Sequence, residues 1–162
     1  MTTFHDYTNS VMREKLCLHI FLSDIYKLCW KNEKYKDIQI LFPEIDSSGA
    51  DIVIVHKQVS CFIQLKSINK NSSTYKFPIN KELFNQSSFC VLLFTLDEET
   101  ISINYRIFKK KENLDYKNAK HSKANAEGIK KERPNIIELP KTEFADIRNT
   151  ELIDKIFDNE NI

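Results

Sequence analysis

An acid, an amide and a lysine stand toward the two ends of the largely apolar stretch DIVIVHKQVSCFIQLKS (residues 51–67), and their types could support phosphate chemistry. Asp51 begins the stretch, and Gln64 and Lys66 lie near its end. A carboxylate and a side-chain amide oxygen suit Mg²⁺, which proteins often hold with one or two carboxylates plus water and phosphate. A lysine beside such an ion can orient an attacking water, while the ion stabilises charge on the phosphate. The residue types therefore predict a metal-dependent hydrolytic site, provided that the fold brings the three side chains together.

The chain around these residues is predicted to form a β-hairpin. The segments ADIVIV and VSCFIQLK are rich in β-branched and aromatic residues and are joined by a short polar link. A hairpin centred on the link Lys57–Gln58 places Asp51 opposite Gln64 and Val53 opposite Phe62. Side chains alternate between the two faces of a strand, so the lysine two residues after Gln64 shares their face. A shift of one residue in this register would separate the carboxylate from the other two groups.

A long helix is predicted before the hairpin, from about residue 10 to residue 31. Apolar residues recur there at helical spacing after the capping candidates Thr8, Asn9 and Ser10. Glu14 lies on the apolar stripe of this helix, so its side chain is predicted to lean toward the buried face, where an unpaired charge is costly. Two interpretations of Glu14 are open: a functional carboxylate, or an acid favoured by the helix dipole in the first turn.

Together these residues resemble the PD-(D/E)xK, or restriction-endonuclease-like, nuclease superfamily. GAD followed by IQLK, that is Gly49, Asp51, Gln64 and Lys66, is similar to its signature of an acid on one strand, then an acid or glutamine, one apolar residue and a lysine on the next. Members commonly carry a glutamate on the helix before the sheet, a position that Glu14 fits. The resemblance covers under half of the chain, and its motif is short. It departs at Gln64, where many relatives have a glutamate, which leaves one carboxylate fewer for a metal.

The resemblance implies a restriction-endonuclease-like fold and a nuclease that hydrolyses phosphodiester bonds of DNA with Mg²⁺ or Mn²⁺. The metal ligands that it implies are Asp51, Gln64 and Glu14, and Lys66 would position the water or stabilise the developing charge. Contacts to nucleic acid are expected from polar and basic residues after the hairpin and in a later basic run, namely Asn69, Lys70, Lys109, Lys110 and Lys111. The expected partner is nucleic acid, with DNA favoured, and a homodimer or a place in a larger complex is left open.

The rest of the chain predicts one α+β domain, residues 1–162. Further strands are predicted at IQILFPEI, SFCVLLFTLD, TISINYRIFK and NIIELP, a short helix at INKELFNQ, a loop at SINKNSSTYKFP, and a closing helix at TELIDKIF capped by Asn149 or Thr150. Residues 109–133 hold nine Lys or Arg against four acids, which predicts a mobile basic segment. The order describes a central mixed sheet with an early antiparallel hairpin, an N-terminal helix packed on one face and a C-terminal helix.

Composition narrows the class of protein. With 162 residues and 41% hydrophobic content, the chain suits a single globular domain. The 24 Lys and Arg residues nearly balance the 23 Asp and Glu residues, so any affinity for nucleic acid must be local. No signal pattern and no apolar run of about 18 residues occurs, so we expect a cytoplasmic protein that does not enter a membrane. The four cysteines are far apart among apolar neighbours and are predicted to be reduced core thiols.

Two other functions compete with a nuclease. The first is a non-catalytic module that keeps the nuclease fold and binds nucleic acid or a protein partner. The second is a plain structural domain in which Asp51 and Lys66 form a cross-strand ion pair, worth about 0–1 kcal/mol if exposed. Glu44 and Asp46 lie close to Asp51 in the sequence and could add negative charge, but a turn acid and a strand-end acid are the simpler interpretation.

Overall fold

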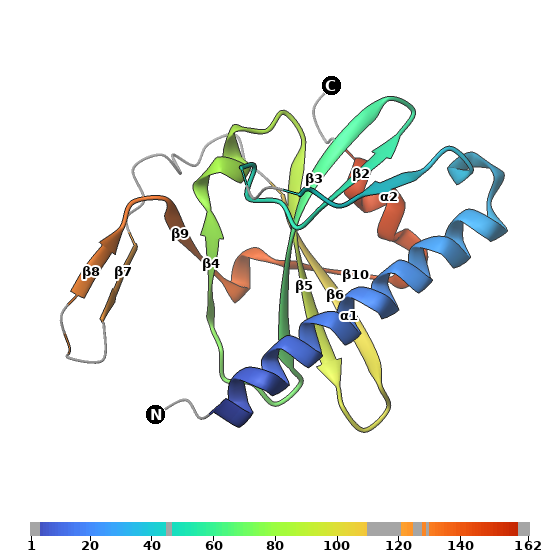
Figure 1. The fold of residues 1–162 in the computed structure, drawn as a ribbon. Helices are drawn as coiled ribbons and strands as arrows, with labels where there is room; N and C mark the ends of the chain where they lie inside the picture. Colours follow the sequence, from blue (N-terminus) through green and yellow to red (C-terminus); the bar gives the residue numbers. More distant parts are fainter. Residues whose placement is uncertain (1–3, 45–46, 110–120, 125–127, 129, 159–162) are drawn as a thin grey trace.

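A six-stranded mixed sheet forms the centre of the protein. The computed structural model describes residues 4–44, 47–109, 121–124, 128 and 130–158 (Figure 1). The sheet has the order β1-β2-β3-β5-β6-β10; β3 and β5 run parallel, and the other neighbours are antiparallel. Its strands are β1 (Gln39–Leu41), β2 (Ile52–His56), β3 (Val59–Asn69), β5 (Phe89–Asp97), β6 (Ser102–Lys109) and β10 (Ala145–Ile147). The predicted α+β class, with a mixed sheet and an early antiparallel hairpin, is confirmed.

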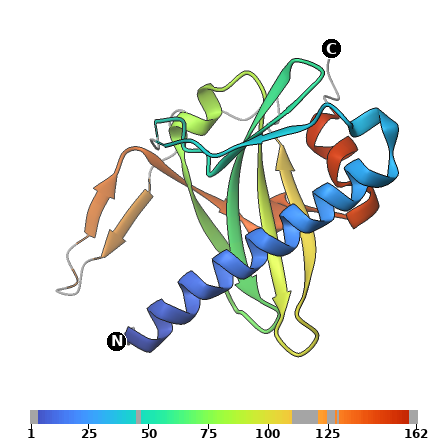
Figure 2. The ribbon, with the colours of Figure 1, turned by 45° about the vertical axis from the view of Figure 1, so that its right-hand side comes forward.

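The two faces of this sheet are covered by different kinds of element. On one face lie the long helix α1 (Phe4–Lys31) and the short helix α2 (Leu152–Phe157). On the other face, β4 (Lys76–Asn80) pairs with β9 (Ile136–Pro140) in a two-stranded sheet of their own. Short 3-10 helices connect the elements: η1 (Glu33–Tyr35), η2 (Lys81–Asn85), η3 (Lys141–Glu143) and η4 (Asn149–Glu151). The helices, the central sheet and the β4–β9 ribbon therefore form three layers (Figures 1 and 2).

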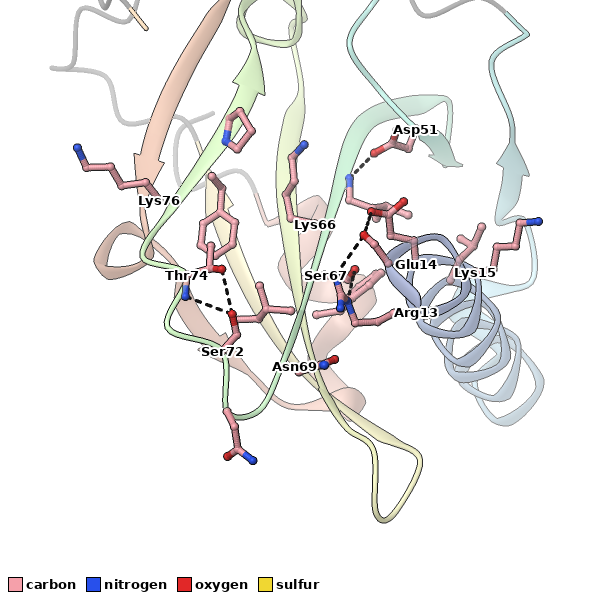
Figure 3. Close-up of a pocket in the computed structure, with 18 residues that line it drawn as sticks. Arg13, Glu14, Lys15, Asp51, Lys66, Ser67, Asn69, Ser72, Thr74 and Lys76 are labelled. Atoms are coloured by element: carbon pink, nitrogen blue, oxygen red, sulfur yellow. Dashed lines mark hydrogen bonds between the residues drawn. The ribbon is translucent and has the colours of Figure 1, made fainter. Parts of the chain in front are cut away.

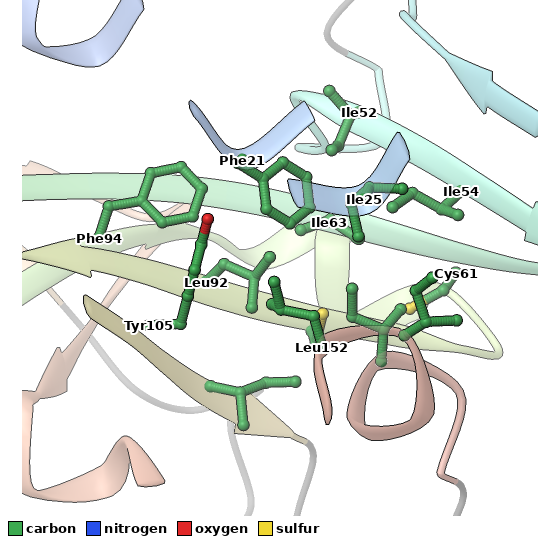
Figure 4. Packing of buried hydrophobic residues seen from close by; sticks show 14 of the residues in the cluster. Phe21, Ile25, Ile52, Ile54, Cys61, Ile63, Leu92, Phe94, Tyr105 and Leu152 are labelled. Carbon is green, nitrogen blue, oxygen red and sulfur yellow. The ribbon is translucent and has the colours of Figure 1, made fainter. Parts of the chain in front are cut away.

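Helix α1 is held on the sheet by its apolar stripe. Cys17, Phe21 and Ile25 follow one another at a spacing of four residues and are completely buried. Phe21 packs against the rings of Phe94 and Tyr105 from β5 and β6 (Figure 4). Full burial of each large apolar side chain contributes about 1.5–3 kcal/mol. This packing fixes the direction in which α1 crosses the sheet, and with it the position of the first half of the helix.

Strand β5 is the most buried strand of the sheet because both of its faces are covered. Cys90, Leu92 and Phe94 belong to the core under the helices, whereas Val91 and Leu93 belong to the core under the β4–β9 ribbon. A strand covered on both faces is expected to be a continuous apolar run without alternation, which is what SFCVLLFTLD shows.

Several element boundaries differ from those predicted. Helix α1 begins at Phe4, so the three predicted capping residues lie inside it. The first strand is only three residues long and ends before Pro43. The segment predicted as a loop after the hairpin is mostly strand, because β3 continues to Asn69 and β4 starts at Lys76. The short helix before β5 is present as η2. Strands β4 and β10 were not expected, since neither shows clear alternation over more than a few residues.

The end of the chain also differs in detail. The closing helix α2 is preceded by η4, and its N-cap residue is Glu151, which makes no side-chain cap, in place of Asn149 or Thr150. Part of the basic segment 109–133 is paired: β7 (His121–Ala124) and β8 (Lys130–Arg133) form a hairpin that extends away from the two other sheets (Figures 1 and 2). Its remaining residues between Lys109 and Lys130, apart from Gly128, lie outside the described part of the chain.

The cysteines are free thiols, as predicted. Cys17, Cys61 and Cys90 are buried and Cys29 is half-buried. Burial raises the pKa of Cys17 to about 11, so this thiol is neutral at physiological pH. In the part of the chain that the structure describes, no helix is both long enough and apolar enough to cross a membrane.

Candidate active site

The candidate site forms just before strand β2 begins, at the side chain of Asp51. The β2–β3 hairpin has the predicted centre and register: Lys57 and Gln58 form its turn with positive φ angles, and Val53 lies opposite Phe62. The pairing ends at Ile52 opposite Ile63, one step before the predicted pair of Asp51 and Gln64. The reason lies in the preceding chain, where Gly49 has a φ of +70° and turns the backbone away from the sheet.

Beyond Ile63, strand β3 keeps its neighbour β5 on one side but has no strand partner on the other side in the described residues. This opens one edge of β3 over its last six residues. The side chain of Asp51 replaces the missing strand at the first open position: its Oδ2 atom accepts a hydrogen bond of 2.6 Å from the Leu65 N–H. The carboxylate is thereby held at the edge of the strand, although it is exposed.

A pocket of about 770 Å³ surrounds this open edge. Five consecutive residues of β3, 65–69, line it, as expected where a pocket wraps around a strand edge and meets side chains from both faces. Helix α1 supplies one wall, and β4 with the loop before it supplies the opposite wall (Figure 3). The lining residues are Ser10, Arg13, Glu14, Lys15, Leu18, Asp51, Leu65, Lys66, Ser67, Ile68, Asn69, Asn71, Ser72, Thr74, Lys76, Phe77, Pro78 and Phe94.

Three of the four predicted catalytic residues line this pocket. Asp51 stands at the open edge of β3, and Glu14 faces it from α1. Lys66 projects from the side of β3 that also carries Ile68, a residue of the core under the β4–β9 ribbon. Glu14 comes 37 positions before Asp51 in the sequence, and Lys66 comes 15 positions after it. The tertiary structure brings these three residues to one pocket. Figure 3 shows the three side chains around the upper part of the pocket.

Glu14 does not lean into the core as predicted. Its side chain is exposed, and Ser10 Oγ donates to its Oε1 atom at 3.5 Å. The apolar stripe of α1 is buried from Cys17 onward, but the helix extends past the core at its beginning, so the same stripe there faces the pocket. The helical spacing therefore predicts the face of α1 on which Glu14 lies. The sequence does not show that this face lies against a pocket in the first turns of the helix.

Gln64 is separated from the other predicted ligands. Its side chain is not among the pocket residues, and its Oε1 atom accepts a hydrogen bond of 3.3 Å from the N–H of Asn80. Asn80 is also the N-cap of η2, where its own side chain accepts from Glu82 N–H. Gln64 thus ties the end of β4 to the central sheet, which is a structural task that needs an amide or carboxylate oxygen.

The residues predicted to contact nucleic acid are scattered. Asn69 lines the pocket, and its Oδ1 atom is buried without a hydrogen-bond partner in the described residues, a situation that costs about 1–3 kcal/mol. Lys70 forms an ion pair with Asp97 at 2.8 Å. Lys109 is half-buried at the other end of the sheet, where burial lowers its pKa and its Nζ donates to the Asp158 carbonyl. Lys110 and Lys111 lie outside the described residues.

Other polar residues in the pocket were not predicted. Arg13 and Lys15 come from α1, Ser67 from β3 and Lys76 from β4. Lys15 and Lys76 point outward from opposite walls (Figure 3). No local pattern marks these residues, because α1, β3 and β4 meet only in the folded chain.

The donor atoms of the pocket are of the type that a hard divalent cation prefers. Among the described residues, no group of three or more His, Cys, Asp or Glu side chains is placed to hold a metal ion. Glu14 and Asp51 offer two carboxylates in one pocket. That set fits Mg²⁺, which commonly takes one or two protein carboxylates and completes its shell with water and phosphate oxygens.

Comparisons with known proteins leave the family of this chain open. No protein-family model matches it, and no curated protein matches it. Among solved structures, the chain is similar to a bacterial homing endonuclease, I-Ssp6803I, with 15% sequence identity, a TM-score of 0.37 and 67% of each chain covered. A likeness at this TM-score does not establish a common fold, so the function has to be inferred from the pocket of this chain.

Proposed function

We propose that this protein is a metal-dependent nuclease that hydrolyses phosphodiester bonds of DNA in the pocket between α1, β3 and β4. The observation that carries the proposal is the presence of Glu14, Asp51 and Lys66 in one pocket. Two carboxylates and an amine around one cavity are groups that hydrolysis of a phosphodiester can use: the carboxylates offer oxygen ligands for a cation, and the amine offers a positive charge for the phosphate.

Each residue has a separate role in this proposal. Asp51 is the primary metal ligand, since the Leu65 N–H fixes its carboxylate at the strand edge. Glu14 supports the same ion directly or through a water. The ammonium group of Lys66 binds a phosphate oxygen or orients the attacking water. When bound, Mg²⁺ would stabilise charge on the phosphate and lower the pKa of a coordinated water. Gln64 remains a predicted ligand only if its side chain exchanges the Asn80 N–H for the metal.

The first test replaces the primary ligand. Asp51→Asn keeps an oxygen that can accept from the Leu65 N–H but removes the negative charge, so the fold should survive. We expect cleavage of plasmid DNA in Mg²⁺ or Mn²⁺ to fall by about 100-fold or more. Asp146→Asn is the matched control, because Asp146 is exposed in an ion pair with Arg106 away from the pocket. Equal cleavage by wild type and both variants would show that Asp51 has no role in the reaction.

A second test measures metal binding without catalysis. Mg²⁺ and Mn²⁺ are titrated into wild type and Asp51→Asn while the melting temperature is followed, with and without a short DNA duplex. A ligand that binds only the folded state raises the melting temperature. The rise should be present in wild type and absent in the variant, and a rise of the same size in both would place the metal elsewhere.

A third test concerns Lys66. Lys66→Met keeps the length of the side chain and removes its charge. The expected loss of cleavage is about 100-fold, the effect of removing one group that stabilises the transition state. Lys27→Met is the control, since Lys27 is an exposed lysine of α1 paired with Asp24. If Lys66→Met cleaves as fast as this control, the lysine has no part in the reaction.

The alternative is a non-catalytic module that binds nucleic acid or a protein partner through the same pocket. The position of Gln64 favours it, because the third expected metal ligand is engaged by Asn80 N–H instead. A binding module would retain its affinity in Asp51→Asn and would show no dependence on divalent metal. Those two measurements separate the alternatives.

A further inference from the structure

Arg13 lines the pocket, and its side chain is held in place by hydrogen bonds. Its side chain is half-buried and hydrogen-bonded at two points. Nε donates to Ser67 Oγ at 3.4 Å, and Nη2 donates to Ser10 Oγ at 3.3 Å. Ser67 belongs to β3 and Ser10 to the preceding turn of α1, so the guanidinium group is fixed between the helix and the open strand edge (Figure 3).

The charge of Arg13 is not neutralised in the described part of the chain. Both of its hydrogen-bond partners are hydroxyl groups, and no carboxylate of the described residues forms an ion pair with it. Arg106 and Arg148 differ in this respect, because Asp146 pairs with the first and Glu151 with the second. A half-buried guanidinium that is oriented by hydroxyls keeps donors and a full positive charge for an anionic ligand.

Arg13 is also next in sequence to a proposed catalytic group, and so is its anchor. It precedes Glu14 on α1, and Ser67 follows Lys66 on β3. The Ser10 hydroxyl accepts from Arg13 and donates to Glu14, and both side chains line the same pocket, so an anion bound by Arg13 lies beside Glu14 of the proposed reaction centre. The walls continue past it to the hydroxyl groups of Ser72 and Thr74, which suit the sugar and phosphate oxygens of a longer ligand.

We propose that Arg13 binds a backbone phosphate of the DNA strand next to the phosphate that is cleaved, and so sets the position of the strand in the pocket. This inference rests on the proposed nuclease function for the identity of the ligand. A guanidinium group can contact two phosphate oxygens at once, which fixes orientation as well as affinity. In this proposal a residue of α1 makes the phosphate contact that the sequence analysis expected from Lys70 and Lys109.

Binding of a short DNA duplex, measured by fluorescence anisotropy without divalent metal over a range of salt concentrations, tests this inference. Each phosphate contact to duplex DNA contributes about 0.9 to the slope of log affinity against log salt. Arg13→Gln should therefore make the slope shallower by about 0.9 and weaken binding about tenfold. Arg13→Lys should keep the slope and lose part of the affinity. Ser67→Ala should weaken binding with an unchanged slope, because the charge stays but one anchor is lost. Arg106→Gln is the control and should change neither quantity.

The outcomes separate this inference from the nuclease proposal. Binding without cleavage by wild type would end the nuclease proposal, and the slope of Arg13→Gln would still decide the role of Arg13. Cleavage by wild type with unchanged slope and affinity in Arg13→Gln would overturn the role of Arg13 alone. If Arg13→Gln does not fold, unchanged affinity in both Arg13→Lys and Ser67→Ala would overturn it. Stabilisation of wild type by inorganic phosphate without any affinity for DNA would overturn the assignment of the ligand as a DNA strand.

Discussion

The two halves of strand β3 differ in the strands that flank them. The first half, Val59–Ile63, pairs with β2 over its whole length and with β5 only at Phe62 and Ile63, and its Cys61 and Ile63 side chains are completely buried. The second half, Gln64–Asn69, keeps β5 but loses β2, and most of it lines the pocket. The difference arises from a single event, the departure of the chain from the sheet at Asp51.

Strand β2 is shorter than strand β3, so the last residues of β3 have an open edge at which a site can form. The first half contributes to stability by burying Cys61 and Ile63 and by pairing its backbone with β2. The second half has an open edge, so its side chains on both faces reach one cavity, and a carboxylate can bond to its backbone. If this description is right, substitutions in the first half should act on stability, and substitutions in the second half should act mainly on ligand binding.

The largest expected effect is the loss of stability in Ile63→Ala. Ile63 is completely buried in the core under α1, so removing its side chain leaves a cavity and should cost about 2–5 kcal/mol. Urea unfolding measures this cost. Ser67→Ala, in the second half of the strand, is the comparison and should change stability by no more than about 1 kcal/mol. Similar costs for the two variants would contradict the division of β3 into two halves.

A smaller loss of stability is expected at the turn around Gly49, just before β2 begins. Gly49→Ala would put a Cβ atom 2.7 Å from the Cβ of Asn80, at a φ of +70°. The strain and the contact should together cost about 1–3 kcal/mol. Gly128→Ala is a matched control, because Gly128 has a φ of +79° but nothing within 4 Å of the added atom.

The difference between the two glycine variants in thermal unfolding measures the contact with Asn80 alone. A shift of Asn80 would also disturb its N–H bond to Gln64, so Gly49→Ala should change DNA binding as well as stability. Equal destabilisation by the two variants would show that the close approach to β4 has no consequence for the site.

A weaker, pH-dependent effect is expected far from the pocket, at the junction of η1 and α2. The Tyr35 hydroxyl donates to Asp154 at 2.6 Å, and the Lys34 ammonium lies 3.0 Å away; these two contacts hold the pKa of Asp154 below its ordinary value of 3.8. A lowered pKa means that the stabilisation is present above the unfolded pKa and is lost as the pH falls through the folded one. Because Asp154 is half-exposed, the effect should be about 1 kcal/mol or less.

Asp154→Asn keeps an acceptor for Tyr35 and removes the charge. The difference in melting temperature between wild type and this variant should therefore be constant near neutral pH and shrink as the pH drops below about 4. Cleavage and DNA binding at neutral pH should stay unchanged, since Asp154 is not among the pocket residues. A difference in melting temperature that does not vary with pH would contradict the assigned ion pair.

No effect on the salt dependence of DNA binding is expected from Lys109→Met. Lys109 lies opposite Cys90, beside the buried half of β3, and burial lowers its pKa. Its ammonium group is bonded to the Asp158 carbonyl and not directed into the pocket. An unchanged salt slope for Lys109→Met together with a shallower slope for Arg13→Gln would support DNA binding at the second half of β3. The reverse result would show that the basic segment makes the phosphate contacts.

The sequence alone determined the positions of β2 and of most of β3, together with the hairpin register, but not the end of β3 or strand β4. Alternation and β-branched content located β2 and β3, and the link Lys57–Gln58 fixed the pair Val53 and Phe62. These features depend on neighbours in the sequence, for which local pattern is sufficient. The sequence also singled out Glu14, Asp51 and Lys66, which one pocket contains, although their catalytic roles remain predictions.

Only the tertiary structure decided which side chains meet. Three features depend on elements distant in sequence: the start of β2 at Ile52, the contact of Gln64 with Asn80, and the position of Arg13 between Ser10 and Ser67. Side-chain periodicity tells which face of a strand or helix a residue occupies, but not what lies opposite that face. At the beginning of α1 the apolar stripe faces a cavity instead of a core, because the helix is longer than the packed surface below it.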